Sequence, residues 1–192
     1  MSIRCFIAIE LGDEIHREIT RLQERLRRDI RANERDVKWV RPENIHLTLK
    51  FLGEVPDSDI PDICQAVEKA VETFHPFKLD VAGCGCFPPR GAARVLWVGV
   101  SEGDTPLPDL QEAVASELEP LGHPPENRPF SAHLTLARIK TAPAGHLVSH
   151  TVDTLEMVRL GSQEVTALTV FQSELTRGGP MYTPLHHADL GK

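Results

Sequence analysis

The stretch Arg-Pro-Glu-Asn-Ile-His-Leu-Thr-Leu at residues 41–49 returns as Arg-Pro-Phe-Ser-Ala-His-Leu-Thr-Leu at residues 128–136. The two nonamers share Arg, Pro, His, Leu, Thr and Leu at the same six positions. Each copy starts with a turn signal and continues as a short apolar run that is typical of a β-strand. A chain that contains such a strand twice is expected to fold as two similar lobes, each built around one copy.

The polar residues of the repeat need an explanation beyond packing. Side chains alternate between the two faces of a strand, so His46 and Thr48 share one face and the leucines share the other. His133 and Thr135 share a face in the same way. The leucines can pack against helices, but packing does not require a histidine and a threonine at matching positions. If a pseudo-twofold axis relates the lobes, two imidazoles and two hydroxyls meet across a central cleft.

This arrangement suits a displacement reaction at phosphorus. An imidazole can act as an acid or a base near neutral pH, so a pair can serve both ends of the reaction. Threonine hydroxyls can donate hydrogen bonds to the non-bridging phosphate oxygens. A strained 2′,3′-cyclic phosphate is an apt substrate because its hydrolysis needs no metal. The alternative is that each histidine is only a satisfied, partly buried side chain.

A metal site is a weaker interpretation of the histidines. A zinc site requires at least three protein ligands, and the adjacent His186 and His187 would point apart in an extended chain. Cys84 and Cys86 could form a metal clip or a strained disulfide, but two reduced thiols are the commoner outcome. We therefore expect no metal and no other cofactor.

The remaining sequence predicts an α+β fold. Helical periodicity occurs at 13–33, 57–73 and 106–121. Strands are predicted at 3–9, 37–40, 45–53, 77–86, 93–100, 131–139, 154–161, 165–175 and 181–186, while 143–150 carries no clear pattern. No flexible linker is evident, so we expect one bilobal domain over residues 1–192, with two antiparallel sheets and helices outside them.

Composition limits the partners of the protein. The net charge is −7, which disfavours a protein that coats long nucleic acid, although the first 50 residues carry 11 basic and 9 acidic side chains. A small anionic ligand or one end of an RNA remains compatible with this charge. The charged face of the helix at 13–33 is either a solvated surface or an RNA-backbone patch. The sequence has neither a membrane-length apolar run nor a signal peptide, so we expect a cytoplasmic monomer that does not bind membranes.

The paired motifs resemble the 2H phosphoesterase superfamily, and in particular its bacterial and archaeal RNA 2′,3′-cyclic phosphodiesterases, historically called 2′-5′ RNA ligases. The resemblance covers nearly the whole chain, including residues 4–11, 37–55, 85–100, 128–138 and 173–185. It implies hydrolysis of an RNA 2′,3′-cyclic phosphate to a 2′-phosphomonoester without ATP or metal. It also implies that His46 protonates the leaving O3′ and that His133 activates water; the spacing itself does not assign these roles.

Three further residues are candidates for substrate binding beside Thr48 and Thr135. Arg138 matches an arginine that the family places near the phosphate, but strict alternation puts it on the leucine face unless the strand bulges near Ala137. Lys50 has the parity of His46 and could contact phosphate, or it could be an exposed lysine. Phe6 could stack on a base, or it could belong to the core.

Two other functions fit the same motifs. One is 2′-5′ ligation of tRNA halves or cleavage of 2′-5′-linked oligonucleotides, although ligation would favour a longer basic groove. The other is a non-catalytic module that binds RNA ends, which would not require two titratable groups. The expected partner in every case is an RNA end, such as a tRNA fragment or a short oligonucleotide.

Overall fold

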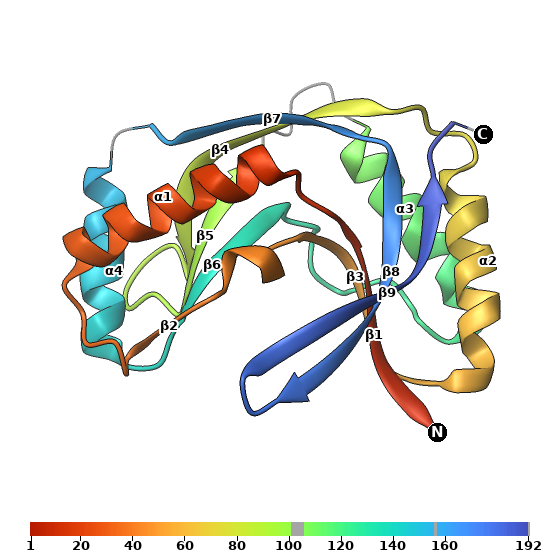
Figure 1. Ribbon diagram of the computed structural model, residues 1–192, viewed down its shortest axis with the longest axis horizontal. Coiled ribbons are helices and arrows are strands. Elements are labelled where there is room, and N and C mark those ends of the chain that lie inside the picture. The colour runs from red at the N-terminus through yellow and green to blue at the C-terminus, as the bar shows by residue number, and fades with distance from the viewer. Residues whose placement is uncertain (101–105, 156, 192) are drawn as a thin grey trace.

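Two antiparallel sheets and four α-helices form the protein, as seen in a computed structural model that describes residues 1–100, 106–155 and 157–191 (Figure 1). The first sheet has the strand order β3 (Leu47–Pro56), β1 (Ser2–Ile9), β8 (Ala167–Thr176) and β9 (Gly179–Asp189). The second sheet has the order β2 (Val37–Trp39), β6 (His133–Ile139), β5 (Val95–Val100), β4 (Phe77–Phe87) and β7 (Arg159–Val165). The predicted α+β architecture is confirmed.

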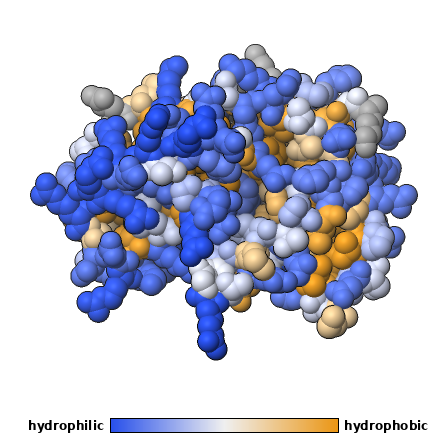
Figure 2. Space-filling view, in the orientation of Figure 1, coloured by the Kyte–Doolittle hydropathy of each residue, from blue (hydrophilic) through white to orange (hydrophobic). Residues whose placement is uncertain are grey.

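Each sheet carries two helices on one of its faces (Figure 1). The first sheet packs against α2 (Ile60–Val71) and α3 (Leu107–Leu118), and the second against α1 (Asp13–Ile30) and α4 (Ala142–Thr154). The apolar stripe of α1, which includes Ile15, Ile19 and Leu26, is buried. Its opposite face is hydrophilic (Figure 2) and holds intrahelical ion pairs such as Arg25–Asp29. No helix in the described ranges is both long and apolar enough to cross a membrane.

The two sheets exchange strands along the chain. β2 immediately precedes the first motif strand, β3, yet it pairs with the second motif strand, β6. Conversely, β8 follows β7 of the second sheet but pairs with β1 at the start of the chain. Neither sheet is therefore made from one continuous half of the sequence.

The prediction was least complete around α4. Residues 143–150 belong to this helix, and the strand predicted at 154–161 instead begins at Arg159; residue 156 lies outside the described residues. The apolar stripe of α4 is short because the helix approaches the chain closely at Gly145. A Cβ atom there would lie 2.5 Å from the Ala93 carbonyl oxygen. A small residue is needed where the two backbones come this close, and it interrupts the apolar periodicity by which a helix is recognised in a sequence.

Both motif strands contain a register shift at the same offset from their histidine. On β3, Thr48 pairs with Ala8 and Lys50 pairs with Ile7, so Leu49 is the extra residue. On β6, Thr135 pairs with Trp97 and Ala137 pairs with Leu96, so Leu136 is the extra residue. Such a bulge reverses the alternation of the residues that follow it. The repeat therefore extends from sequence into backbone geometry.

Candidate active site

The His46 ring lies against three aromatic side chains. It follows a short 3-10 helix, Pro42–Asn44, and precedes the first residue of β3. Ring centroids are 4.5 Å apart for Phe6, 5.1 Å for Tyr182 in an edge-on contact, and 6.2 Å for Phe171. Phe6 comes from β1, whereas Phe171 and Tyr182 come from β8 and β9. Strands from both ends of the chain thus hold this imidazole in place.

His133 has a comparable setting on the second sheet. Its ring meets Phe87 edge-on at 5.2 Å between centroids and lies 6.5 Å from the Trp97 ring. Trp97 is the cross-strand neighbour of both Thr135 and Gly85. The indole occupies the space that a side chain at Gly85 would need, since a Cβ atom there would lie 2.2 Å from the ring.

The two imidazoles are anchored in the same way. His46 Nδ1 is 3.0 Å from the Asn44 carbonyl oxygen, and His133 Nδ1 is 2.7 Å from the Ser131 carbonyl oxygen. In each case the acceptor lies two residues before the histidine. A carbonyl accepts only, so Nδ1 carries the hydrogen in both rings. Nε2 of each ring is left to take up or release a proton.

Burial sets the protonation state of His46 in the free protein. Burial lowers the pKa of His46 to about 4, against a smaller opposing effect of the hydrogen bond to the Asn44 carbonyl. Removing water disfavours the charged imidazolium, and no carboxylate contributes to the shift to compensate. His46 is therefore neutral at pH 7 when no ligand is bound.

Tyr182 lies beside His46 and within the influence of arginines from both sheets. Its ring contacts His46, and burial raises the pKa of its hydroxyl, against the smaller opposing effects of the positive charges of Arg138 and Arg4. Arg138 lies on β6, the strand of His133, whereas Tyr182 lies on β9 of the first sheet. The positive charge of Arg138, on the strand of His133, therefore acts on a side chain that contacts His46. This is consistent with two half-sites that face each other.

The bulges decide which side chains share the histidine faces. Residues five positions after each histidine, Phe51 and Arg138, return to that face, and both are exposed. The bulge on which an inward Arg138 depended is present, at Leu136. Phe51 was missed from the sequence, although the identical offset of Arg138 from His133 was the available signal.

Lys50 requires a correction. The prediction that it shares the face of His46 and Thr48 is wrong, because the bulge at Leu49 turns it to the side of Ile7. Lys50 is only 3% exposed, and its Nζ donates a hydrogen bond to the Pro124 carbonyl oxygen. It is a buried structural side chain, and its equivalent on β6, Ala137, is buried as well.

Phe6 belongs to a hydrophobic cluster, which is the second of its two predicted alternatives. The ring is 3% exposed and packs against His46, Phe171 and Tyr182, so no face is free to stack on a base. The Phe6 ring stacks against the ring of the catalytic candidate His46 and supports it. The neighbouring Phe51, at 6.2 Å between ring centroids and 58% exposed, is the aromatic ring available on that face.

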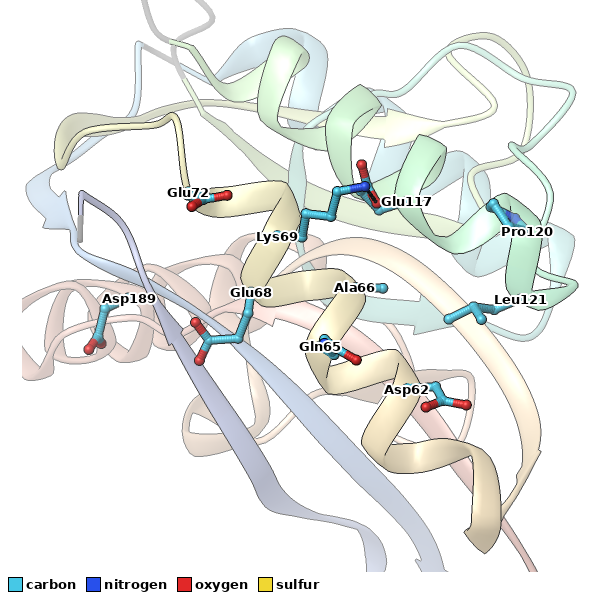
Figure 3. Close-up of a pocket in the computed structure, with 10 residues that line it drawn as sticks. All are labelled: Asp62, Gln65, Ala66, Glu68, Lys69, Glu72, Glu117, Pro120, Leu121 and Asp189. Carbon is cyan, nitrogen blue, oxygen red and sulfur yellow. Dashed lines mark hydrogen bonds and ion pairs between the residues drawn. The ribbon is translucent and has the colours of Figure 1, made fainter.

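A groove of about 680 Å³ lies elsewhere, between α2 and α3 (Figure 3). None of the motif residues lines it, and its walls carry carboxylates, including Asp62, Glu72 and Glu117. Lys69 Nζ is 2.8 Å from a Glu117 carboxylate oxygen. An acidic wall repels phosphate, so this groove is a poor candidate for an RNA end despite its size.

Possible metal ligands lie apart from one another in the described part of the chain. No group of three or more His, Cys, Asp or Glu side chains there is arranged to hold a metal ion. His186 and His187 separate as an extended backbone requires: His186 pairs with Glu68 at 2.8 Å, while His187 Nδ1 lies 2.9 Å from the Thr169 hydroxyl. The four cysteines are free thiols.

Known proteins are similar to this chain in sequence and in fold. The model of the LigT-like phosphoesterase family matches residues 9–97 and again 98–182, one match for each histidine motif. An RNA 2′,3′-cyclic phosphodiesterase of Methanothermobacter thermautotrophicus is 33% identical over 185 residues, covering 96% of this chain and 97% of the relative.

Two solved structures illustrate the similarity in fold. A protein of Thermus thermophilus has a TM-score of 0.80 and 30% identity, with 98% of each chain covered. Escherichia coli LigT complexed with 3′-AMP has a TM-score of 0.78 and 26% identity, with 100% of each chain covered. Sequence, motif geometry and fold agree, and the chain belongs to the LigT-like family of 2H phosphoesterases.

Proposed function

We propose that this protein hydrolyses the 2′,3′-cyclic phosphate at the end of an RNA to a 2′-phosphomonoester. The observation that carries the proposal is the matched pair of imidazoles, each fixed by its Nδ1 and free at its Nε2. A reaction with one proton to remove and one to deliver uses two such groups. A binding module would gain nothing from holding them in this way.

The steps follow from this geometry and from the family resemblance. His133 Nε2 takes a proton from water, whose oxygen bonds to phosphorus. The bond between phosphorus and O3′ breaks, and O3′ takes a proton from His46 Nε2. Thr48 and Thr135 donate hydrogen bonds to the non-bridging oxygens, and Arg138 supplies positive charge beside them. Phe51 offers an exposed ring on which the terminal base can stack.

The role of His46 as proton donor depends on the substrate. With a pKa of about 4 in the free protein, His46 carries no proton to give at pH 7. A bound phosphate places negative charge beside the ring, which favours the imidazolium and raises its pKa. Protonation of His46 is therefore coupled to substrate binding.

The relatives support an RNA phosphate as substrate. Curated relatives with 28–36% identity are named RNA 2′,3′-cyclic phosphodiesterases, and the E. coli relative has been solved with 3′-AMP. We extend that substrate class to this chain. The physiological RNA that we favour is a fragment with a cyclic phosphate end, acted on in the cytoplasm, where the four thiols remain reduced.

The test uses a short RNA with a 2′,3′-cyclic phosphate end, incubated with the protein and EDTA. We expect conversion to the 2′-phosphomonoester, with His46→Ala and His133→Ala each reducing kcat/KM by about 10²-fold or more. His146→Ala is the matched control, since His146 is exposed on α4. Phe51→Ala is expected to raise KM with a smaller effect on kcat.

Product mapping separates the alternatives. A 3′-phosphate product would reverse the leaving group, and joining of two RNA ends would indicate ligation. Wild-type turnover by either histidine variant would contradict the acid–base scheme. Loss of hydrolysis in EDTA with recovery on adding a divalent metal would contradict the metal-free reaction.

A further inference from the structure

The motif face of the first sheet is organised in cross-strand rows. Paired residues of antiparallel strands lie side by side on the same face, so the register assigns each side chain to a row. Three successive rows run across β3, β1 and β8. The first row is Thr48, Ala8 and Thr169, and the second is Phe51, Phe6 and Phe171. The third row is Glu54, Arg4 and Ser173, and Tyr182 of β9 extends it because it pairs with Ser173.

Arg4 is the cation of this third row. It shares a face with Phe6, the residue packed beneath His46, because the two lie two positions apart on β1. Arg4 is exposed, and its positive charge, like that of Arg138, opposes the rise that burial causes in the pKa of the Tyr182 hydroxyl. Neither Arg4 nor Tyr182 makes a side-chain hydrogen bond or ion pair with any residue of the described ranges. Glu54, its neighbour on β3, instead accepts a hydrogen bond from Ser2.

We infer that Arg4, together with the Tyr182 hydroxyl, binds the 5′-phosphate of the nucleotide that carries the cyclic phosphate. In an RNA this group is the internucleotide phosphate that joins the last two residues. The inference rests on the proposed function and predicts a preference for substrates that carry a 5′-phosphate, as every chain of at least two nucleotides does. A lone nucleoside 2′,3′-cyclic phosphate would leave Arg4 unused.

Spacing and chemistry support this position. Two residues along a strand span about 6.8 Å, which is comparable with the separation of neighbouring phosphates in a ribonucleotide chain. The guanidinium fork matches two phosphate oxygens at once. Tyr182 stays protonated at neutral pH, because burial raises the pKa of its hydroxyl, and it can donate a further hydrogen bond.

The test compares two substrates that differ only at O5′. One is a nucleoside 2′,3′-cyclic phosphate, and the other is the same compound with a 5′-phosphate. For wild-type protein we expect the 5′-phosphate to raise kcat/KM by about 10-fold, mainly through KM, as a charged hydrogen-bonded contact would. Arg4→Ala is expected to remove that advantage while leaving turnover of the simpler substrate nearly unchanged. Arg4→Lys should retain part of it, because a lysine keeps the charge and loses the fork.

Two control variants address general charge effects. Arg25→Ala removes an exposed arginine of α1 that pairs with Asp29, and it should keep the full advantage. Lys38→Ala removes the cation that lies opposite Arg138 on the neighbouring strand of the second sheet, and it should also keep most of it. The inference is overturned if wild-type protein does not distinguish the substrates, if Arg4→Ala keeps the advantage, or if Lys38→Ala alone removes it.

Binding provides the same comparison without turnover. Titration with a nucleoside 2′,5′-bisphosphate and with the corresponding 2′-monophosphate should give an Arg4-dependent difference in Kd of similar size. If the proposed hydrolysis failed while this difference persisted, the phosphate site would stand and the reaction would not. If hydrolysis occurred without any 5′-phosphate effect, the reaction would stand and the Arg4 site would not.

Discussion

His46 shows how far a single residue is determined by its surroundings. The repeated His-Leu-Thr-Leu strand was sufficient to identify His46 and His133 as a pair. The sequence did not reveal that Phe171 and Tyr182, more than 120 positions away, would cover His46 and change its pKa. Such contacts arise from strand pairing between the two ends of the chain, which local patterns do not encode.

The buried neutral state of His46 makes stability depend on pH. The pKa of this ring falls from 6.5 to about 4 on folding, so the unfolded chain binds more protons between these values. The free energy of unfolding therefore decreases as the pH falls from 6.5 towards 4, by roughly 2–3 kcal/mol from this group. Chemical denaturation of the wild type at several pH values, compared with His46→Gln, measures the effect.

His46→Gln should show a shallower loss of stability over this pH window. His146→Gln, at an exposed position, should follow the wild type. Equal slopes for the wild type and His46→Gln between pH 6.5 and 4 would mean that the ring protonates as easily in the folded protein as in the unfolded chain.

At the scale of elements, the two bulges explain both a success and a failure of sequence reasoning. Arg138 was correctly recognised as needing a bulge to reach the face of His133. Lys50 was assigned by strict alternation, although it occupies the equivalent stretch of the other copy. A bulge leaves no clear mark in composition, because Leu49 and Leu136 read as ordinary strand residues. Applying the repeat to backbone geometry as well as to residue identity would have placed Lys50 and Phe51 correctly.

Gly85 on β4 is a sensitive position in the second sheet. We expect Gly85→Ala to displace the Trp97 ring, because the new methyl group would lie 2.2 Å from an indole carbon. Overpacking of this kind costs about 1–3 kcal/mol, and a shifted indole would disturb the neighbouring His133 and Thr135. Denaturant unfolding and kcat/KM on a cyclic phosphate substrate together measure these losses.

Gly12→Ala is the matched control, since its methyl group would meet only the Gln163 side-chain oxygen, at 3.8 Å. This variant should keep near wild-type stability and activity. Full activity in Gly85→Ala would show that the indole position does not matter for His133.

At the scale of the whole molecule, the exchange of strands links the two sheets. β2 joins the second sheet from between elements of the first, and β8 and β9 return to the first sheet from the far end of the chain. The pseudo-twofold arrangement could be expected from the repeat, but this exchange could not, because the motif specifies a strand and not its partner. Neither sheet can complete its hydrogen bonding alone.

We therefore expect the chain to unfold as one cooperative unit. Trp39 and Trp97 both lie in the second sheet, so tryptophan fluorescence follows that sheet. Hydrogen exchange of the β1 amides follows the first sheet. The two probes should give the same free energy of unfolding within error, as two-state behaviour requires. Separate transitions would instead indicate two independent domains.

The residues that the two bulges bring to the histidine faces make the two halves of the candidate site chemically different. Each motif strand presents one side chain five positions beyond its histidine, yet one copy offers a benzyl ring and the other a guanidinium. In the proposed reaction, this difference lets a pseudo-symmetric site distinguish the base of a nucleotide from its phosphate. A nucleotide bound in the opposite orientation would place its base beside Arg138 and its phosphate beside Phe51. Strand polarity, and with it the choice of which ester oxygen departs, would then be decided by Phe51 and Arg138 and not by the histidines themselves.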